Sequence, residues 1–237
     1  MSAPNPAGNT PGKPFPPVPP ASLTERRKAE TRMEIARAAA ALFVGQGLRA
    51  TRAEDIAQAA GVAPRTFYRY FATKEEAVAP LYAAGAQLWV EAVRAAPAAL
   101  SVPEVLEHAV RHTLTPGACV SAASWEWVRT LVRLARTSPA LGKVWGEVCL
   151  ASEQTLAEVL AERTAPAEVA DNVADAAAHT LELRFTAAVV GAVVRVAVES
   201  WAGTPAPPSG PEGPAALALR NLGALRDFPW GEGRRGG

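Results

Sequence analysis

Cysteine is scarce in this chain of 237 residues: Cys119 and Cys149 are the only two, and they form no CxxC pair. This excludes a disulfide framework and a cysteine-based metal site, and it is typical of packed thiols in a reducing compartment. The longest uncharged, mostly apolar run, Phe185 to Val194, is about half the length of a membrane span. No apolar signal segment stands near the N-terminus. We therefore expect a cytoplasmic protein with no membrane partner.

The sequence also lacks the motifs that usually mark enzymes. It has no glycine-rich phosphate loop, no nucleophile elbow and no coupled Cys–His spacing. His108 and His112 stand four residues apart, a spacing that can hold a metal on a helix, but no third ligand with a defined spacing accompanies them. We expect no catalytic site, no cofactor and no metal. A zinc-binding regulator is the alternative, and a metal assay showing no stoichiometric zinc or nickel would exclude it.

Charge is distributed unevenly along the chain, although the overall net charge is only +1. From Glu25 to Lys74 there are ten basic and five acidic residues, a net charge of about +5, whereas the remainder carries about −4. A basic N-terminal module on a mildly acidic body is expected of a nucleic-acid-binding protein with a separate regulatory part.

The hydrophobic pattern is helical throughout and never alternates as in strands, which predicts an all-α fold. A first helix is expected at 25–45. Thr51 with Glu54 fits a capping box for a second helix, and Thr73 with Glu76 fits another for a fourth helix that runs towards Ala95. Further helices are expected at about 102–113, 119–136, 139–164, 167–200 and 214–226. The predicted domains are a Pro/Gly-rich tail (1–23), a DNA-binding domain (24–74), a helical regulatory and dimerisation domain (75–228) and a second tail (229–237).

The segment 51–74 carries the clearest functional signal. Gly61 would end the second helix, and Pro64 would open a third at a position where its missing N–H costs nothing. Ile56, Phe67 and Phe71 would anchor this helix pair in a core. The side chains left outside are basic, hydroxyl-bearing or aromatic, as a helix in the major groove requires. Arg65, Thr66 and Arg69 would then read base edges, while Tyr68, Tyr70, Lys74, Thr51 and Arg52 would hold phosphates.

Residues from about 31 to 78 resemble the N-terminal domain of TetR-type transcriptional regulators, through IARAAAALFVGQG, TRAEDIAQAAGV and TFYRYFATKEE. The resemblance implies a helix-turn-helix domain whose DNA contacts come from the residues just named, with Pro64 at the start of the recognition helix. Ala63 departs from the pattern, because such proteins usually place a serine or a similar N-cap there. Without this cap the recognition helix loses about 1 kcal/mol of stability. The resemblance also implies a repressor released from a palindromic operator, a double-stranded DNA partner, by a small-molecule ligand.

A single recognition helix reads few bases, so such modules act in pairs on two-fold symmetric sites. The helix expected at 167–200 has an apolar face almost too wide for one side, which indicates a homodimer interface; the alternative is a helix buried in the monomer. The predicted interface residues are Leu181, Phe185, Ala188, Val189, Ala192, Val193 and Val196, with Leu222 on the last helix.

Four tryptophans, Trp89, Trp125, Trp127 and Trp145, lie on the helices of the regulatory part and are candidates for the lining of an effector pocket, although such residues can also be plain core. Arg129 follows Trp125 by about one helical turn and could meet an anionic group. The stretches WVRTLVRLARTSPAL and TLELRFTAAVVGAVVRVAVESW resemble mycofactocin-regulator-like members, which implies an apolar or acyl-type effector. The rival interpretation of the whole chain is a helical scaffold that binds proteins through its Pro-rich tail and dimer face.

Overall fold

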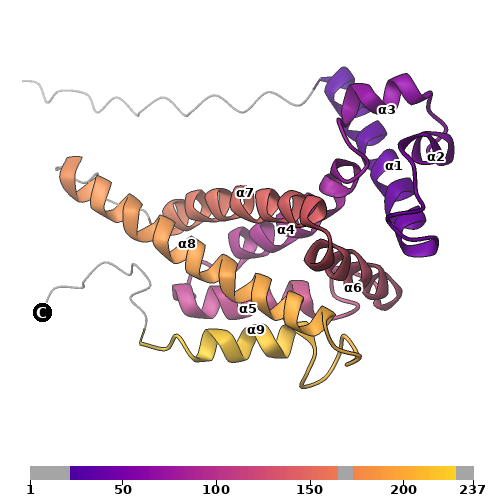
Figure 1. Cartoon of the computed structure of the whole chain (residues 1–237). Coiled ribbons are helices and arrows are strands. Elements are labelled where there is room, and N and C mark those ends of the chain that lie inside the picture. The colour runs from indigo at the N-terminus through magenta and orange to yellow at the C-terminus, as the bar shows by residue number, and fades with distance from the viewer. Residues whose placement is uncertain (1–21, 165–172, 228–237) are drawn as a thin grey trace, which may run out of the picture.

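The computed structural model describes residues 22–164 and 173–227, and within these ranges every regular element is helical (Figure 1). The predicted all-α fold is confirmed. The helices, in chain order, are α1 (Leu23–Gly45), α2 (Ala53–Ala59), α3 (Pro64–Tyr70), the 3-10 turn η1 (Glu76–Val78), α4 (Ala79–Ala95), α5 (Val102–Leu114), α6 (Ala122–Thr137), α7 (Pro139–Thr164), α8 (Val173–Ala202) and α9 (Pro214–Gly223). For the helix predicted at 167–200, residues 167–172 lie outside the described ranges, and the described part is α8.

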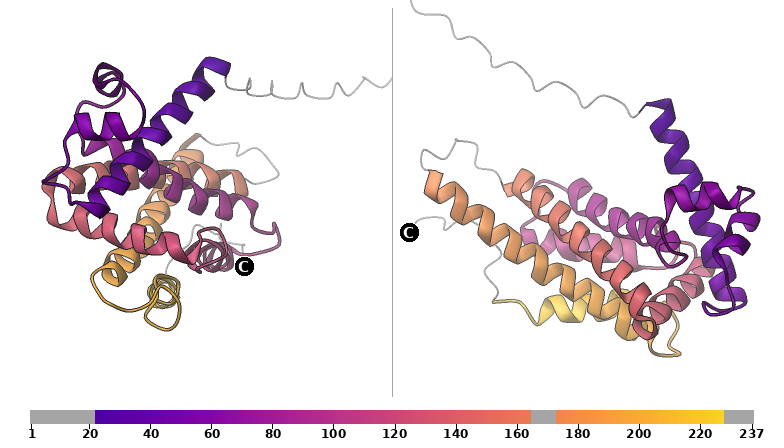
Figure 2. Two further views of the ribbon diagram at one scale, coloured as in Figure 1. Left: turned by 90° about the vertical axis from the view of Figure 1, so that its right-hand side faces the viewer. Right: turned by 45° about the horizontal axis from the view of Figure 1, so that its top comes forward.

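Helices α1 to α3 form a small unit at one end of an elongated body that contains α4 to α9 (Figures 1 and 2). In the body, α7 packs against α4, α6 and α8, while α9 lies against α8 and α5. No helix among the described residues has the length and apolar character needed to cross a bilayer.

The first helix ends at Gly45, as predicted, and begins at Leu23, two residues before the predicted start. The Ser22 hydroxyl accepts a hydrogen bond of 3.2 Å from the Glu25 amide at its start. At its end Gly47 has a φ of +88°, a left-handed conformation that glycine adopts without a steric penalty. One side of α1 is buried through Ile35, Ala39 and Phe43. These side chains form part of the hydrophobic core of the N-terminal unit.

The predicted capping box of Thr51 with Glu54 is wrong by one residue. The N-cap of α2 is Arg52, whose amide donates to Asp55 Oδ2 over 2.8 Å. Thr51 is instead 1% exposed, and its hydroxyl donates to the Gly47 carbonyl over 2.9 Å. Its side chain ties the turn after α1 to the start of α2, so it caps no helix.

The second predicted capping box is present in a modified form. The Glu76 amide donates to Thr73 Oγ1 over 3.2 Å, but the return bond to the Glu76 carboxylate comes from the Ala72 amide, at 3.0 Å. The backbone therefore makes a 3-10 turn first, and α4 begins only at Ala79.

Two hydrophobic clusters stabilise the molecule. The first joins Phe43, Ile56, Phe67 and Phe71 of the N-terminal unit to side chains of α4, α6 and α7, including Leu141. The second fills the body between α4 to α9. Because the first cluster contains residues from both parts, the recognition helix rests on a core that α4, α6 and α7 share.

Candidate nucleic-acid interface and ligand cavity

Helix α3 is fixed by its aromatic side and by the turn before it. Gly61 has a φ of +67°, and the Val62 amide closes the turn on the Ala57 carbonyl over 2.9 Å. Pro64 occupies the first turn of α3, and Ala63 supplies no side-chain cap, as expected from the sequence. Phe67 and Phe71 are buried against α1 and α2, with ring centroids 5.8 Å apart.

The opposite side of α3 is left in solvent at the outer end of the molecule (Figure 1). Arg65 and Arg69 are exposed there, Tyr68 is 52% exposed, and Thr66 and Tyr70 are half-buried. The Arg69 guanidinium lies 5.3 Å from the centre of the Tyr70 ring. This side of α3 therefore combines bidentate donors with hydroxyl groups, the chemistry that reads bases and phosphates.

Two residues predicted to hold phosphates are engaged inside the protein. Lys74 Nζ donates to the carbonyls of Leu48 and Thr51, both at 2.7 Å, and is partly buried. The Thr51 side chain is buried, as described above. Both residues brace the segment between α1 and α2, so the structure assigns them a positioning role. Arg52 and Pro64 are exposed at the starts of α2 and α3.

Tyr68 has a partner that the sequence did not reveal. Its hydroxyl donates to Glu54 Oε1 on α2 over 3.0 Å, and this hydrogen bond raises the pKa of Tyr68. The bond fixes the ring orientation on the exposed side of α3. It also places a carboxylate close to the point where a DNA phosphate would meet the tyrosine.

We expect Glu54→Gln to strengthen DNA binding roughly 3- to 10-fold at low salt, because it removes a carboxylate that repels nearby phosphates. Fluorescence anisotropy with a labelled operator measures the change. Tyr68→Phe is the matched control: it also breaks the bond to Glu54 but loses the phosphate donor, so affinity should fall. An unchanged affinity for Glu54→Gln would contradict the repulsion.

The body contains a large cavity of about 850 Å³, bounded by α4, α5, α6, α7 and α8 and reached by α1. Trp89, Trp125 and Trp145, candidates for the lining of an effector pocket, all lie in its wall. Trp127, 43% exposed, also lines it. The size is that of cavities that hold drug-sized molecules. Most of the wall is apolar, so it favours an apolar occupant.

Arg129 does not belong to this cavity, and its predicted contact with an anionic ligand is wrong. Its guanidinium is buried, donates to the carbonyls of Thr204 and Ala206, and lies 4.4 Å from the centre of the Trp201 ring. Both terminal nitrogens of the guanidinium donate to this loop and its flat face is covered by Trp201, so Arg129 links the loop after α8 to α6.

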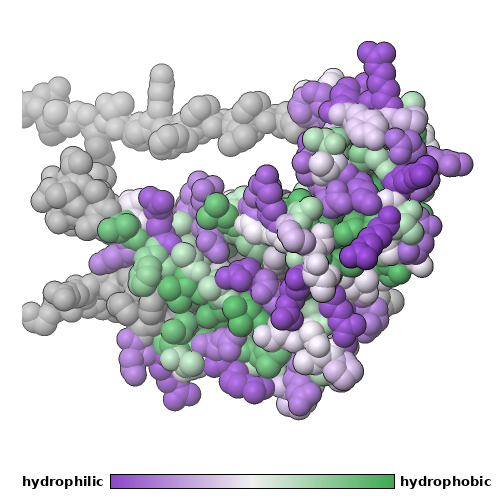
Figure 3. Space-filling view, viewed as in Figure 1, coloured by the Kyte–Doolittle hydropathy of each residue, from purple (hydrophilic) through white to green (hydrophobic). Residues whose placement is uncertain are grey.

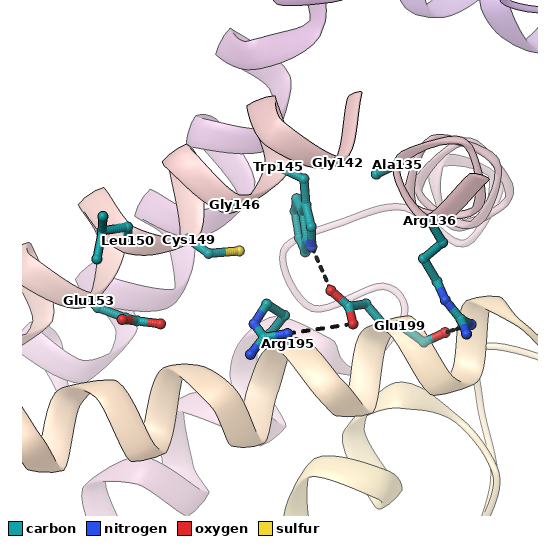
Figure 4. Close-up of a pocket in the computed structure, with 10 residues that line it drawn as sticks. All are labelled: Ala135, Arg136, Gly142, Trp145, Gly146, Cys149, Leu150, Glu153, Arg195 and Glu199. Carbon is teal, nitrogen blue, oxygen red and sulfur yellow. Dashed lines mark hydrogen bonds and ion pairs between the residues drawn. The ribbon is translucent and has the colours of Figure 1, made fainter. Parts of the chain in front are cut away.

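A second, smaller cavity of about 470 Å³ lies between α7 and α8 and centres on Glu199 (Figure 4). One carboxylate oxygen accepts from Trp145 Nε1 over 2.7 Å, and the other lies 3.7 Å from Arg195 Nη1. Glu153 borders both cavities, and burial raises the pKa of its carboxyl group. Burial likewise raises the pKa of the Cys149 thiol to about 11, so this thiol is protonated at neutral pH.

The group of Glu153, Arg195 and Glu199 could not be found from the sequence, because Glu153 lies on α7 and the other two lie on α8, far apart in the chain. The spacing of Arg195 and Glu199, one helical turn, was the one local signal available. His108 and His112, the candidate metal pair, lie with parallel rings 6.4 Å apart. Across the described ranges, no three His, Cys, Asp or Glu side chains gather in an arrangement that could hold a metal.

The apolar face of α8 divides into two sides. Leu181, Phe185 and Val196 are 67%, 59% and 45% exposed. Ala188 is exposed as well, and Val189 and Ala192 are half-buried on the same stripe. Apolar surface is visible over α8 and α9 in Figure 3. Val193 and Leu222 are buried in the core of the protomer, which corrects their placement at a dimer interface.

A helix-turn-helix with an anchored, basic recognition helix on a cavity-bearing helical body defines a DNA-binding regulator class. Residues 35–79 match the model for bacterial regulatory proteins of the tetR family. The HTH-type transcriptional regulator TcmR of Streptomyces glaucescens is 31% identical over 184 residues, which cover 76% of each chain.

Solved structures agree with this assignment. The TetR-family repressor FadR of Thermus thermophilus, in complex with lauroyl-CoA, is 26% identical with a TM-score of 0.51, over 82% of this chain and 92% of that one. A TetR-family regulator structure from a Rhodococcus species is 18% identical with a TM-score of 0.52, over 83% and 98% of the two chains, and supports the fold. The chain belongs to the tetR family and is a DNA-binding transcriptional regulator.

Proposed function

We propose that the protein is a homodimeric repressor, without enzymatic activity, that leaves a palindromic operator when a small apolar molecule enters its large cavity. Residues 24–74 would form the DNA-binding domain and 75–228 the regulatory domain, and the protein would act in the cytoplasm. The observation that carries this proposal is the cavity of about 850 Å³, walled by four tryptophans and bounded by helices of both parts.

The contacts around the cavity suggest how an occupant would act on DNA binding. Tyr82 lines the cavity, belongs to the cluster that holds the recognition helix, and donates its hydroxyl to the Leu131 carbonyl over 2.9 Å. Its ring also lies 5.0 Å from that of Trp145. A ligand that favours another arrangement of α4 and α6 would therefore shift the core residues against which α3 packs, and α3 with them. It need only bind that state more tightly than the DNA-bound state.

The likeness to an acyl-CoA-bound repressor supports an apolar effector, since that relative carries lauroyl-CoA. In the chain described here, the wall offers aromatic rings and aliphatic side chains to the body of such a molecule. Contacts with these rings and exclusion of water would supply most of the affinity.

Occupancy can be tested with N-phenyl-1-naphthylamine, an uncharged aromatic probe whose fluorescence rises in apolar surroundings. We expect the protein to bind it, and Ala84→Trp to weaken binding about tenfold or more, because Ala84 lines the cavity and an added indole occupies its space. Ala83→Trp is the matched control, since Ala83 is the exposed neighbour on the same helix and lies outside the lining.

The regulatory step is tested on the DNA upstream of the gene. DNase I footprinting should reveal two half-sites related by two-fold symmetry, and compounds screened for release should fail against Ala84→Trp while releasing Ala83→Trp. Release that is equal for both variants would place the effector outside the cavity and would refute the proposal.

A further inference from the structure

The large cavity is not confined to the regulatory helices. Arg37 and Ala41, one turn apart on α1, belong to its wall together with Leu81 and Tyr82 of α4. The other side of α1 is buried in the core on which the recognition helix rests, through Ile35 and neighbouring residues. A molecule that fills this part of the cavity would therefore contact α1, a helix of the N-terminal unit, directly.

Arg37 brings a cation to a cavity wall that is mostly apolar. It is exposed, and in the part of the chain that the structure describes its guanidinium takes part in no ion pair, although Glu34 stands one turn earlier on α1. Trp127 and Leu88, both cavity-lining and both among the exposed large apolar residues, lie on α6 and α4. A guanidinium beside exposed apolar walls can bind a carboxylate or sulfonate through paired, charge-assisted hydrogen bonds.

The remaining charges of the wall do not offer the same chemistry. Arg195 lies 3.7 Å from Glu199 and shares the cavity wall with Glu153, so two carboxyl groups surround this one guanidinium. An anion placed there would have to share the Arg195 guanidinium with the Glu199 carboxylate, which already lies beside it. The acidic end of a ligand is therefore favoured at Arg37, with its apolar body directed towards α7 and α8.

We propose that the effector is an aromatic organic acid whose acidic group is held by Arg37, so that the effector binds the DNA-binding domain and the regulatory domain at once. This rests on the proposed function of the cavity as the effector site. The aromatic character follows from the rings of Trp89, Trp125, Trp127, Trp145 and Tyr82, which offer stacked and edge-on contacts to a flat ligand. Its affinity then depends on the position of α1, and by linkage α1 responds to the ligand.

Two probes that differ by a single sulfonate test the assignment. 8-Anilinonaphthalene-1-sulfonate is N-phenyl-1-naphthylamine with one added acidic group. At low salt, we expect Arg37→Gln to weaken binding of the sulfonate about tenfold and to leave binding of the uncharged probe within about twofold. Arg37→Lys should recover part of the loss. Arg26→Gln is the matched control, an exposed arginine on α1 outside the cavity lining.

The outcomes separate the two proposals. If both probes bind, Ala84→Trp weakens both, and Arg37→Gln changes neither or changes both equally, the role of Arg37 is refuted and the cavity proposal stands. If Arg195→Gln selectively weakens binding of the sulfonate probe while Arg37→Gln binds both probes normally, the acidic group lies at α8. That result would also refute the role of Arg37. If neither probe binds, or Ala84→Trp has no effect on either, the effector cavity itself is refuted and the assignment of Arg37 falls with it.

Discussion

Replacing Arg65 and Arg69 together with alanine is expected to weaken operator binding at least about 100-fold at roughly 0.1 M salt. Both side chains are exposed on α3, away from the buried side that Phe67 and Phe71 form. A good bidentate contact from arginine to guanine discriminates by about 1–3 kcal/mol, and a phosphate contact adds a salt-dependent share. Because the proposed dimer would carry both substitutions twice, even the lower end of this range gives a loss of the stated size.

Anisotropy titrations at several salt concentrations measure this effect. The logarithm of the affinity of the unaltered protein should fall steeply with that of salt concentration, and the variant should have a shallower slope. Arg111→Ala is the matched control: this exposed arginine on α5 pairs with Glu107 at 3.0 Å, remote in sequence from the recognition helix. Unchanged affinity of the double variant, with its helical content and oligomeric state intact, would exclude α3 as the reading element and favour a scaffold function.

The sequence was sufficient for features that depend on neighbours along the chain. The apolar residues four apart, Phe67 and Phe71, indicated the buried side of α3, and the structure buries both. Pro64 and Gly61 marked the start of α3 and the turn before it. These signals work because helix ends and faces are set by local backbone geometry, which a residue type imposes within one or two turns.

Two of the differences concern residues whose partners are distant in sequence. Arg129 is bound to Thr204, 75 residues away, and no helical spacing could reveal that contact. Lys74 reaches back to Leu48 across 26 residues, which gives a surface cation a structural role. Polar side chains that satisfy buried carbonyls are invisible to a hydrophobic pattern, because the pattern records burial of apolar groups alone.

The wide apolar surface of α8 shows a different difficulty. Periodicity correctly indicated that this helix has more apolar side chains than one packing face needs. Periodicity does not separate the side chains that face the core from those that face solvent. It therefore places Val193 with Leu181 and Val196, although Val193 is buried in the core of the protomer. The division depends on where α6, α7 and α9 pack against α8, which is a tertiary fact.

The exposed stripe that remains on α8 leads to the second large expected effect. We expect Leu181→Asp combined with Val196→Asp to raise the dimer dissociation constant at least about 1000-fold. Each substitution would place a carboxylate in an apolar contact, and a two-fold interface contains every such carboxylate twice. Burying an unpaired charge costs several kcal/mol, and about 4 kcal/mol corresponds to this change. Analytical ultracentrifugation over a range of protein concentrations measures the constant.

Leu23→Asp is the matched control, because Leu23 has the same 67% exposure as Leu181 but lies at the start of α1. The protomer fold should persist in the double variant, since both replaced side chains are already in solvent and Val193 and Leu222 still close the core. If the variant stays dimeric, the interface lies elsewhere. If it becomes monomeric and still binds a full operator as tightly as the unaltered protein, pairing of recognition helices contributes nothing. Monomers confined to weak half-site binding would instead make α8 the element that sets the spacing between the two copies of α3, the quantity that an effector must alter.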